Sequence, residues 1–137
     1  MYPEELVTPM KEELTERGFE ELLNANEVDE TLKKQGTALV MINSVCGCSA
    51  GTARPGVLMA VANATKKPDI LATSFAGFDV EAVKSIRRHL MPYPPSSPSI
   101  ALFKDGNLVH FIERHNIEGR SAQMIANNLV SAFDEFC

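Results

Sequence analysis

Apolar positions along the chain fall into two patterns, short clusters and helical spacings. Five short segments predict strands, at 19–23, 37–43, 69–75, 99–103 and 108–113. The Asp105-Gly106 pair between the last two segments is typical of the tight turn of a hairpin. The segment 37–43 (TALVMIN) is polar only at its ends, so we expect that strand to be buried on both faces.

Helical patterns occupy most of the chain between these strands. Pro3 and then Thr8-Pro9 predict a helix in two pieces, because proline suits a first helical turn, and Gly18 is placed to end it. Asp79 is expected to cap the helix that follows it. Further helices are predicted over 26–34, 52–64, 80–90 and 118–136.

The order of these elements predicts the fold class. A β-α-β unit comes first, and a hairpin with a final helix follows. We therefore expect an α/β fold, with a central mixed β-sheet flanked by α-helices on both faces. This is a thioredoxin-like arrangement. No repeat or low-complexity tract divides the chain, so a single domain over 1–137 is expected.

Composition and charge narrow the possible functions. The chain is 45% hydrophobic and 23% charged, as in globular proteins. Its 13 Lys and Arg residues against 18 Asp and Glu residues give a net charge of −5, which argues against nucleic-acid binding. No apolar run is long enough for a membrane span, and the acidic start lacks signal-peptide features. We therefore expect a cytoplasmic protein without a membrane partner.

Two of the three cysteines, Cys46 and Cys48, are separated only by Gly47 and follow the predicted buried strand. Disulfides are rarely structural in the cytosol, so such a pair indicates redox chemistry. A Cys-x-Cys disulfide needs an irregular turn, for which Gly47 offers backbone freedom. We expect this disulfide to be easier to reduce than that of a thioredoxin.

Position suggests different roles for the two thiols. A thiol at a helix start is near free N–H groups and the positive end of the helix dipole, which lower its pKa. Cys46 comes first and is expected to be the exposed nucleophile, and Cys48 is expected to resolve its mixed disulfide. Ser44 and Ser49 are accessory candidates that hydrogen-bond the thiolate, but turn and cap contacts explain them equally well.

Three more features are candidates for the same site. Ser97-Pro98 starts a strand after the proline-rich loop, where we favour a cis peptide bond that presents the backbone to an extended substrate. Arg54 is the cation nearest to the cysteines in sequence, and it is either a thiolate or substrate contact or a solvated helix residue. Cys137 is either an accessory redox thiol or an inert terminal residue.

The chain resembles the bacilliredoxin family. The resemblance is carried by 43–48 (NSVCGC), 53–55 (ARP) and 91–98 (MPYPPSSP), and it extends over essentially the whole chain. It implies a thioredoxin-like fold and a glutaredoxin-like role in oxidative stress. The co-substrate would be bacillithiol, a low-molecular-weight thiol, with no bound cofactor. The partners would be bacillithiolated or disulfide-bearing client proteins.

The resemblance also implies residue roles. Cys46 would take bacillithiol from the client protein, and Cys48 or a second bacillithiol would then clear Cys46. The tryptophan that precedes the first cysteine in thioredoxins is absent, with Val45 in its place, so substrate docking should differ from that of thioredoxin. The resemblance implies that Ser97 and Pro98 contact the substrate, and Gly47 and Arg54 are our further candidates for substrate binding.

Other functions stay open at this point. The same pair would serve a protein disulfide isomerase or reductase. Cys46 and Cys48 with Cys137 or a histidine would give three ligands for a soft metal ion, although the spacing matches no zinc-finger pattern, and we expect no metal. A thioredoxin-like domain also occurs as a non-catalytic binding module.

Overall fold

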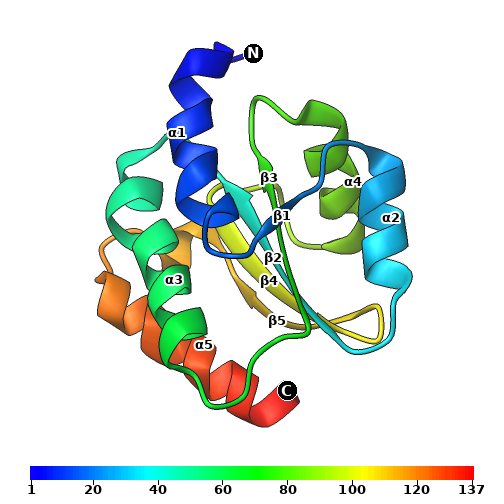
Figure 1. Cartoon of the computed structure of the whole chain (residues 1–137), viewed down its shortest axis with the longest axis vertical. Helices are drawn as coiled ribbons and strands as arrows, with labels where there is room; N and C mark the ends of the chain where they lie inside the picture. The colour runs from blue at the N-terminus through cyan, green and yellow to red at the C-terminus, as the bar shows by residue number, and fades with distance from the viewer.

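A five-stranded mixed sheet forms the centre of the molecule (Figure 1), in a computed structural model that describes all 137 residues. The helices are α1 (Glu4–Thr15), α2 (Ala25–Lys33), α3 (Arg54–Asn63), α4 (Val80–His89) and α5 (Ala122–Phe136). The strands are β1 (Glu20–Glu21), β2 (Thr37–Asn43), β3 (Ile70–Phe75), β4 (Ser99–Lys104) and β5 (Asn107–Ile112). Two short helical turns, η1 (Ser49–Ala53) and η2 (Arg114–Asn116), complete the structure.

The strand order explains why one segment is apolar throughout. The order is β1-β3-β2-β4-β5, with β2 parallel to β3 and antiparallel to β4. As a central strand covered on both faces, β2 is buried at every position. The predicted hairpin joins β4 to β5 through Asp105 and Gly106, both at positive φ.

Helices cover both faces of the sheet (Figure 1). α1, α3 and α5 lie on one face, around a core that includes Leu14, Val57 and Leu129. α2 and α4 lie on the other face, around a core that includes Val28 and Ile86. The predicted α/β fold class is therefore confirmed. No helix of the structure is both long and apolar enough to cross a membrane.

The N-terminal helix differs from its prediction. α1 is one continuous helix that begins after Pro3 and contains Pro9. The Thr8 hydroxyl donates to the Glu4 carbonyl, one turn earlier, instead of capping a second helix. Gly18, at a φ of +95°, follows the end of this helix, as predicted.

The start of α5 and the capping of α4 also differ from their predictions. α5 begins at Ala122, because Ser121 caps it and accepts the N–H of Met124. Asp79 is at the N-cap position of α4, which begins at Val80 as predicted, but its side chain makes no capping hydrogen bond. Its carboxylate accepts the backbone N–H of Phe75 and pairs with Lys11 of α1. Asp79 therefore fixes the loop that leaves β3.

Candidate active site

The cysteine pair lies directly after β2, at the edge of the sheet. Cys46 and Cys48 form a disulfide, and their Cα atoms are 5.4 Å apart. Both cysteines are partly exposed, and Gly47 between them is exposed. Cys48 packs against the apolar core under α3 and α5. The disulfide is therefore open to solvent on the side of Gly47.

Irregular backbone connects the cysteines to α3. Residues Ser49–Ala53 form a π-helical turn, which frequently marks functional sites, and α3 follows directly. The N–H groups of Ser49 and Ala50 donate to the Cys46 carbonyl at 3.0 and 3.2 Å. Helical backbone therefore begins at Gly47, before the predicted helix start at Thr52, and the irregular turn follows the cysteine pair instead of containing it.

The turn does not depend on glycine in the way that we expected. Gly47 is not in the left-handed region of φ, and a Cβ atom added there would meet no atom within 4 Å. Backbone freedom at Gly47 is therefore not what closes the ring. The open space above Gly47 leaves room for an approaching substrate.

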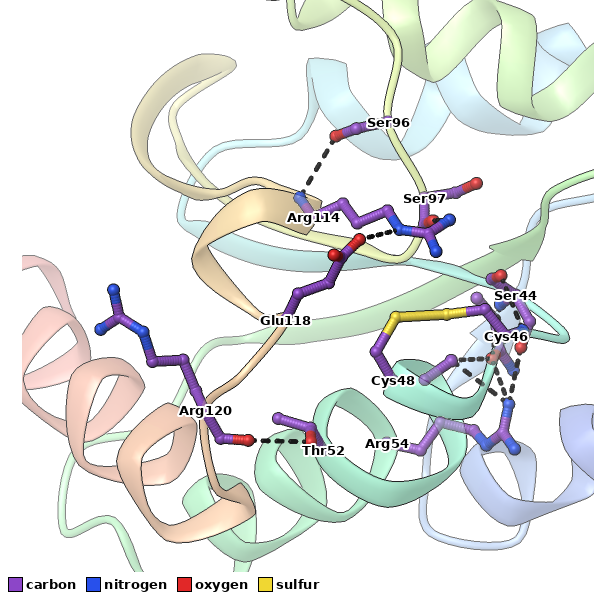
Figure 2. The surroundings of a disulfide bond; sticks show 12 residues. Ser44, Cys46, Cys48, Thr52, Arg54, Ser96, Ser97, Arg114, Glu118 and Arg120 are labelled. Carbon is purple, nitrogen blue, oxygen red and sulfur yellow. Dashed lines mark hydrogen bonds and ion pairs between the residues drawn. A yellow bond between two sulfur atoms is a disulfide. The ribbon is translucent and has the colours of Figure 1, made fainter.

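A buried arginine, Arg54, lies beside the cysteine turn (Figure 2). It is 1% exposed, so neither a solvated helix residue nor a direct substrate contact describes it. Its Nη1 donates to Asn43 Oδ1 at 3.0 Å, to the Ser44 carbonyl at 2.8 Å and to Ser49 Oγ at 3.3 Å. Its Nε pairs with Glu13 Oε1 of α1 at 3.1 Å. Arg54 thus joins α1, the end of β2 and the start of α3.

The two serines of the turn have structural contacts. Ser44 Oγ accepts the N–H of Cys46 at 3.2 Å. The Ser49 hydroxyl is fully buried and donates to Asn43 Oδ1 at 3.1 Å. Asn43 Oδ1 also accepts the Ser44 N–H at 2.8 Å, and Asn43 Nδ2 donates to the Met10 carbonyl at 3.1 Å. These bonds fix the backbone that carries Cys46.

The Ser97-Pro98 peptide bond is cis, as the sequence analysis favoured. Ile42 of β2 pairs with Ser99 of β4, so the segment before β4 lies next to the segment after β2. The Ser97 carbonyl accepts Nη1 of Arg114 at 3.1 Å. Sequence reasoning therefore placed Ser97 and Pro98 correctly beside the cysteine turn.

Sequence reasoning missed three residues that surround the disulfide (Figure 2). Arg114 pairs with Glu118, and its backbone N–H donates to Ser96 Oγ at 3.4 Å. The Arg120 carbonyl accepts the Thr52 hydroxyl at 3.0 Å, which ties η1 to the segment before α5. These residues lie far from the cysteines in sequence, and the i, i+4 spacing of Arg114 and Glu118 was their only local signal.

Cys137 lies at the opposite end of β2 from the disulfide. Its side chain is exposed and lies near Thr37, the first residue of this 7-residue strand, which spans roughly 20 Å. Burial raises the pKa of the Cys137 thiol, and the contact with Thr37 opposes that shift. An accessory role for Cys137 in direct exchange with Cys46 therefore does not fit the structure.

The distance between Cys137 and the cysteine pair also concerns the hypothesis of a soft-metal site. Cys137 was the candidate third ligand for a soft metal ion, and it is remote from Cys46 and Cys48. No cluster of three or more His, Cys, Asp or Glu side chains in the structure has the geometry to hold a metal ion. The structure gives the metal-binding alternative no support.

Comparisons with known proteins bear on the role of the cysteine pair. A family model described as disulphide isomerase matches residues 2–137. A bacilliredoxin of Cytophaga hutchinsonii is 59% identical over 135 residues, which are 98% of this chain and 99% of that protein. A bacilliredoxin of Geobacillus kaustophilus is 48% identical over 137 residues, which cover 99% and 94% of the two chains. This chain belongs to the bacilliredoxin family.

Solved structures show how this family member folds. Oxidised mitochondrial thioredoxin 3 of Saccharomyces cerevisiae aligns with a TM-score of 0.59 at 15% identity, over 90% of this chain and 98% of that one. Oxidised thioredoxin of Plasmodium falciparum gives 0.59 at 14% identity, over 84% and 97%. These likenesses show the thioredoxin fold. Together with the Cys46–Cys48 pair, bacilliredoxin membership supports a thiol–disulfide oxidoreductase.

Proposed function

We propose that this bacilliredoxin family member removes bacillithiol from S-bacillithiolated cytosolic proteins, with Cys46 as the nucleophile. The proposal is carried by one observation, the partly exposed Cys46–Cys48 pair beside the cis Ser97-Pro98 bond, in a chain with bacilliredoxin relatives. Bacillithiol is the co-substrate. Thiols carry all the electrons of the reaction, so it requires no bound cofactor.

The reaction consists of two thiol–disulfide exchanges. In the first, the Cys46 thiolate attacks the bacillithiol sulfur of the mixed disulfide. The S–S bond breaks, and the client cysteine leaves as a thiolate that takes a proton from water. In the second, the Cys48 thiolate attacks Cys46 Sγ, which forms the Cys46–Cys48 disulfide and releases bacillithiol. The mixed disulfide gains two electrons, and a thiol reductant must restore the cysteine pair.

A monothiol route has the same first step. A second bacillithiol then attacks the adduct on Cys46, which restores the Cys46 thiolate and yields bacillithiol disulfide. Cys48 is not needed for this route. The two routes therefore differ in the fate of the adduct and not in the nucleophile.

The surroundings of the pair support this order of attack. Cys48 packs against the apolar core, whereas the Cys46 N–H is held by Ser44 Oγ in the turn. Ser97 lies beside the pair, and its carbonyl is engaged by Arg114. A carbonyl oxygen has two lone pairs, so a substrate N–H can share that oxygen with the guanidinium.

The test is intact-protein mass spectrometry of Cys48→Ala after incubation with a bacillithiolated client protein. We expect one bacillithiol adduct, mapped to Cys46, and a client returned to its free thiol. Cys137→Ala, as a matched control, should behave as the wild type, and Cys46→Ala should leave the client modified. An adduct on Cys137, or unreactive thiols in the folded protein, would refute the proposal.

Disulfide isomerisation is a second candidate, favoured by the description of the matching family model. Here the Cys46 thiolate attacks a wrongly formed disulfide in a client, and a client thiol later displaces Cys46. No net electron transfer occurs, so neither bacillithiol nor Cys48 is required. Recovery of activity by a scrambled disulfide protein, catalysed by Cys48→Ala without bacillithiol, would identify this function.

A further inference from the structure

A cavity of about 510 Å³ lies along α4 and has no part in the chemistry described above. Its cationic lining comes from Lys84, Arg87 and Arg88 of α4. Its apolar lining includes Val80, Met91 and Tyr93. We call this surface, defined by these six residues, the α4 patch.

The charge of the α4 patch is unbalanced. None of its three cations forms an ion pair, and no carboxylate lines the cavity, although the chain carries a net charge of −5. The Nε of Arg87 is buried without a hydrogen-bond partner. Asp29 of α2 interacts with Arg88 at longer range, but its carboxylate is bonded to Ser85 and His89. The three unpaired cations of the patch therefore complement the charge of an acidic ligand.

The apolar side chains of the patch are exposed to an unusual degree. Met91 is 72% exposed, Val80 55% and Tyr93 48%. The Tyr93 ring is fixed by an edge contact with Phe111, with the ring centroids 5.1 Å apart. Aromatic residues, Met and Arg are the types enriched where proteins bind other proteins. Together with the positive charge, this composition favours a segment that is both acidic and apolar.

The patch is continuous with the redox site. β2 and β3 end side by side, with Asn43 paired to Phe75, so the cysteine turn and the start of α4 lie at the same edge of the sheet. The loop 91–98 forms one wall of the cavity and ends at Ser97-Pro98. Figure 2 shows Ser96 and Ser97 of this loop in the surroundings of the disulfide. A chain that extends along the loop from the disulfide therefore reaches the patch.

We propose that the α4 patch docks an acidic segment with apolar side chains that belongs to the client protein. The segment lies in the same polypeptide as the client's modified cysteine, and its docking presents the mixed disulfide to Cys46. This inference rests on the proposed function. It predicts that the α4 patch affects the reaction of protein substrates, which extend to the patch, and does not affect the reaction of small disulfides, which do not reach it.

The experiment uses the Lys84→Glu/Arg88→Glu variant, which reverses two exposed charges and leaves the partly buried Arg87 in place. Lys33→Glu/Lys34→Glu, with both positions exposed at the end of α2, is the matched control. Three substrates are compared at low ionic strength. Two are bacillithiolated peptides that differ only in acidic or basic flanks, and the third is the mixed disulfide of bacillithiol with free cysteine.

For the α4 variant, kcat/KM on the acidic peptide should fall by at least about tenfold, because steering and docking are both lost. The basic peptide should react faster, and the cysteine mixed disulfide at the wild-type rate. An equal loss on all three substrates overturns the proposal, as does no change on any of them. A wild-type dimer that dissociates in the variant overturns it in favour of a second copy as the occupant.

Binding is measured separately, so that the docking proposal does not depend on turnover. The same peptides with Ser in place of Cys are followed by fluorescence anisotropy. Binding of the acidic peptide, weakened in the α4 variant but not in the control, supports the patch even if the wild type proves inactive. An inactive wild type would refute the proposed function alone. Absence of acidic-peptide binding to the wild type would refute the patch alone.

Discussion

Arg54 places a positive charge beside the redox pair with only partial compensation. Its hydrogen bonds go to three neutral oxygens, and its ion-pair partner Glu13 has a side chain that is 45% exposed. Water screens an exposed carboxylate, so Glu13 does not fully neutralise the buried guanidinium. We therefore expect the positive charge of Arg54 to stabilise a thiolate at Cys46 once the disulfide is reduced.

Glu13→Gln tests this field, because it removes the negative charge and keeps an acceptor for Arg54. In a Cys48→Ser background, the Cys46 thiolate should appear at a pH lower by a few tenths of a unit, measured by ultraviolet absorbance. Glu12→Gln, an exposed neighbour on α1, should leave the titration unchanged. An unchanged titration in Glu13→Gln would show that the guanidinium acts only through geometry.

The opposite change is expected when the cation itself is removed. Arg54→Met should move thiolate formation to higher pH and lower the free energy of unfolding by about 3 kcal/mol, because buried acceptors lose their donor. Urea denaturation provides the second measurement. Arg17→Met, at an exposed site, should change stability by less than about 0.5 kcal/mol.

Cys137 provides another prediction at this scale. Because burial raises the pKa of its thiol, a smaller fraction is thiolate at neutral pH. In the reduced protein, iodoacetamide should modify Cys137 more slowly than Cys46, as followed by peptide mass spectrometry. In urea this difference should disappear. Equal rates in the folded protein would contradict the environment that we assign to Cys137.

What could be predicted for single residues depended on how local the signal was. The Cys46–Cys48 pair is recognisable from adjacent residues. The cis Ser97-Pro98 bond was favoured only when the proline-rich loop was considered together with the cysteine turn. The burial of Arg54 depends on α1 and the end of β2 meeting at its side chain, and no spacing in the sequence encodes that. The α4 patch was missed for the same reason, because its apolar rim and its cations become neighbours only when the loop 91–98 folds back.

At the scale of elements, apolar clusters predicted the strands well because burial in the sheet sets both their length and their pattern. Helix starts were predicted less well. α1 continues through Pro9, where a new helix start was predicted. At the start of α4, the Asp79 carboxylate bonds to the Phe75 N–H and to Lys11 instead of capping the helix. The π-helical turn before α3 had no sequence signal, because it follows from how Asn43 and Arg54 hold the ends of the turn.

The packing of α3 on α5 depends on Gly56. A Cβ atom there would lie 2.8 Å from Ile125 Cβ and 3.0 Å from the Ala122 carbonyl. Gly56→Ala should therefore lower the free energy of unfolding by about 1–2 kcal/mol, since overpacking exceeds the gain in helix propensity. Gly51→Ala, with no atom within 4 Å, should be neutral or slightly stabilising. Urea denaturation of both variants decides, and equal stabilities would refute this close approach.

At the scale of the whole molecule, the redox pair and the third cysteine lie at opposite ends of the sheet. The cysteine turn, Ser97-Pro98 and the α4 patch lie at the end where β2 and β3 finish. Cys137 and Thr37 lie at the other end. The two apolar cores occupy the faces between these ends. Because both cores extend well beyond the cysteine turn, we expect the oxidised and reduced proteins to share this fold.

The balance between those redox states follows from what surrounds the thiols. The positive charge of Arg54 is expected to stabilise a thiolate and has no comparable effect on a disulfide, so it favours the reduced form. We expect a reduction potential less negative than the value of about −270 mV typical of thioredoxin, measured by equilibration with glutathione buffers. Glu13→Gln should raise the potential further, because it strengthens the positive field.

Stability must change in step with the potential, because folding and reduction form one thermodynamic cycle. For each 30 mV by which the reduction potential of the folded protein is less negative than that of its unfolded chain, the free energy of unfolding of the oxidised protein is about 1.4 kcal/mol lower than that of the reduced protein. Urea unfolding should therefore show the oxidised protein to be no more stable than the reduced one. A markedly more stable oxidised protein, or a potential more negative than that of thioredoxin, would mean that the site is built to hold its disulfide. Its exchange with client mixed disulfides would then need a different source of driving force.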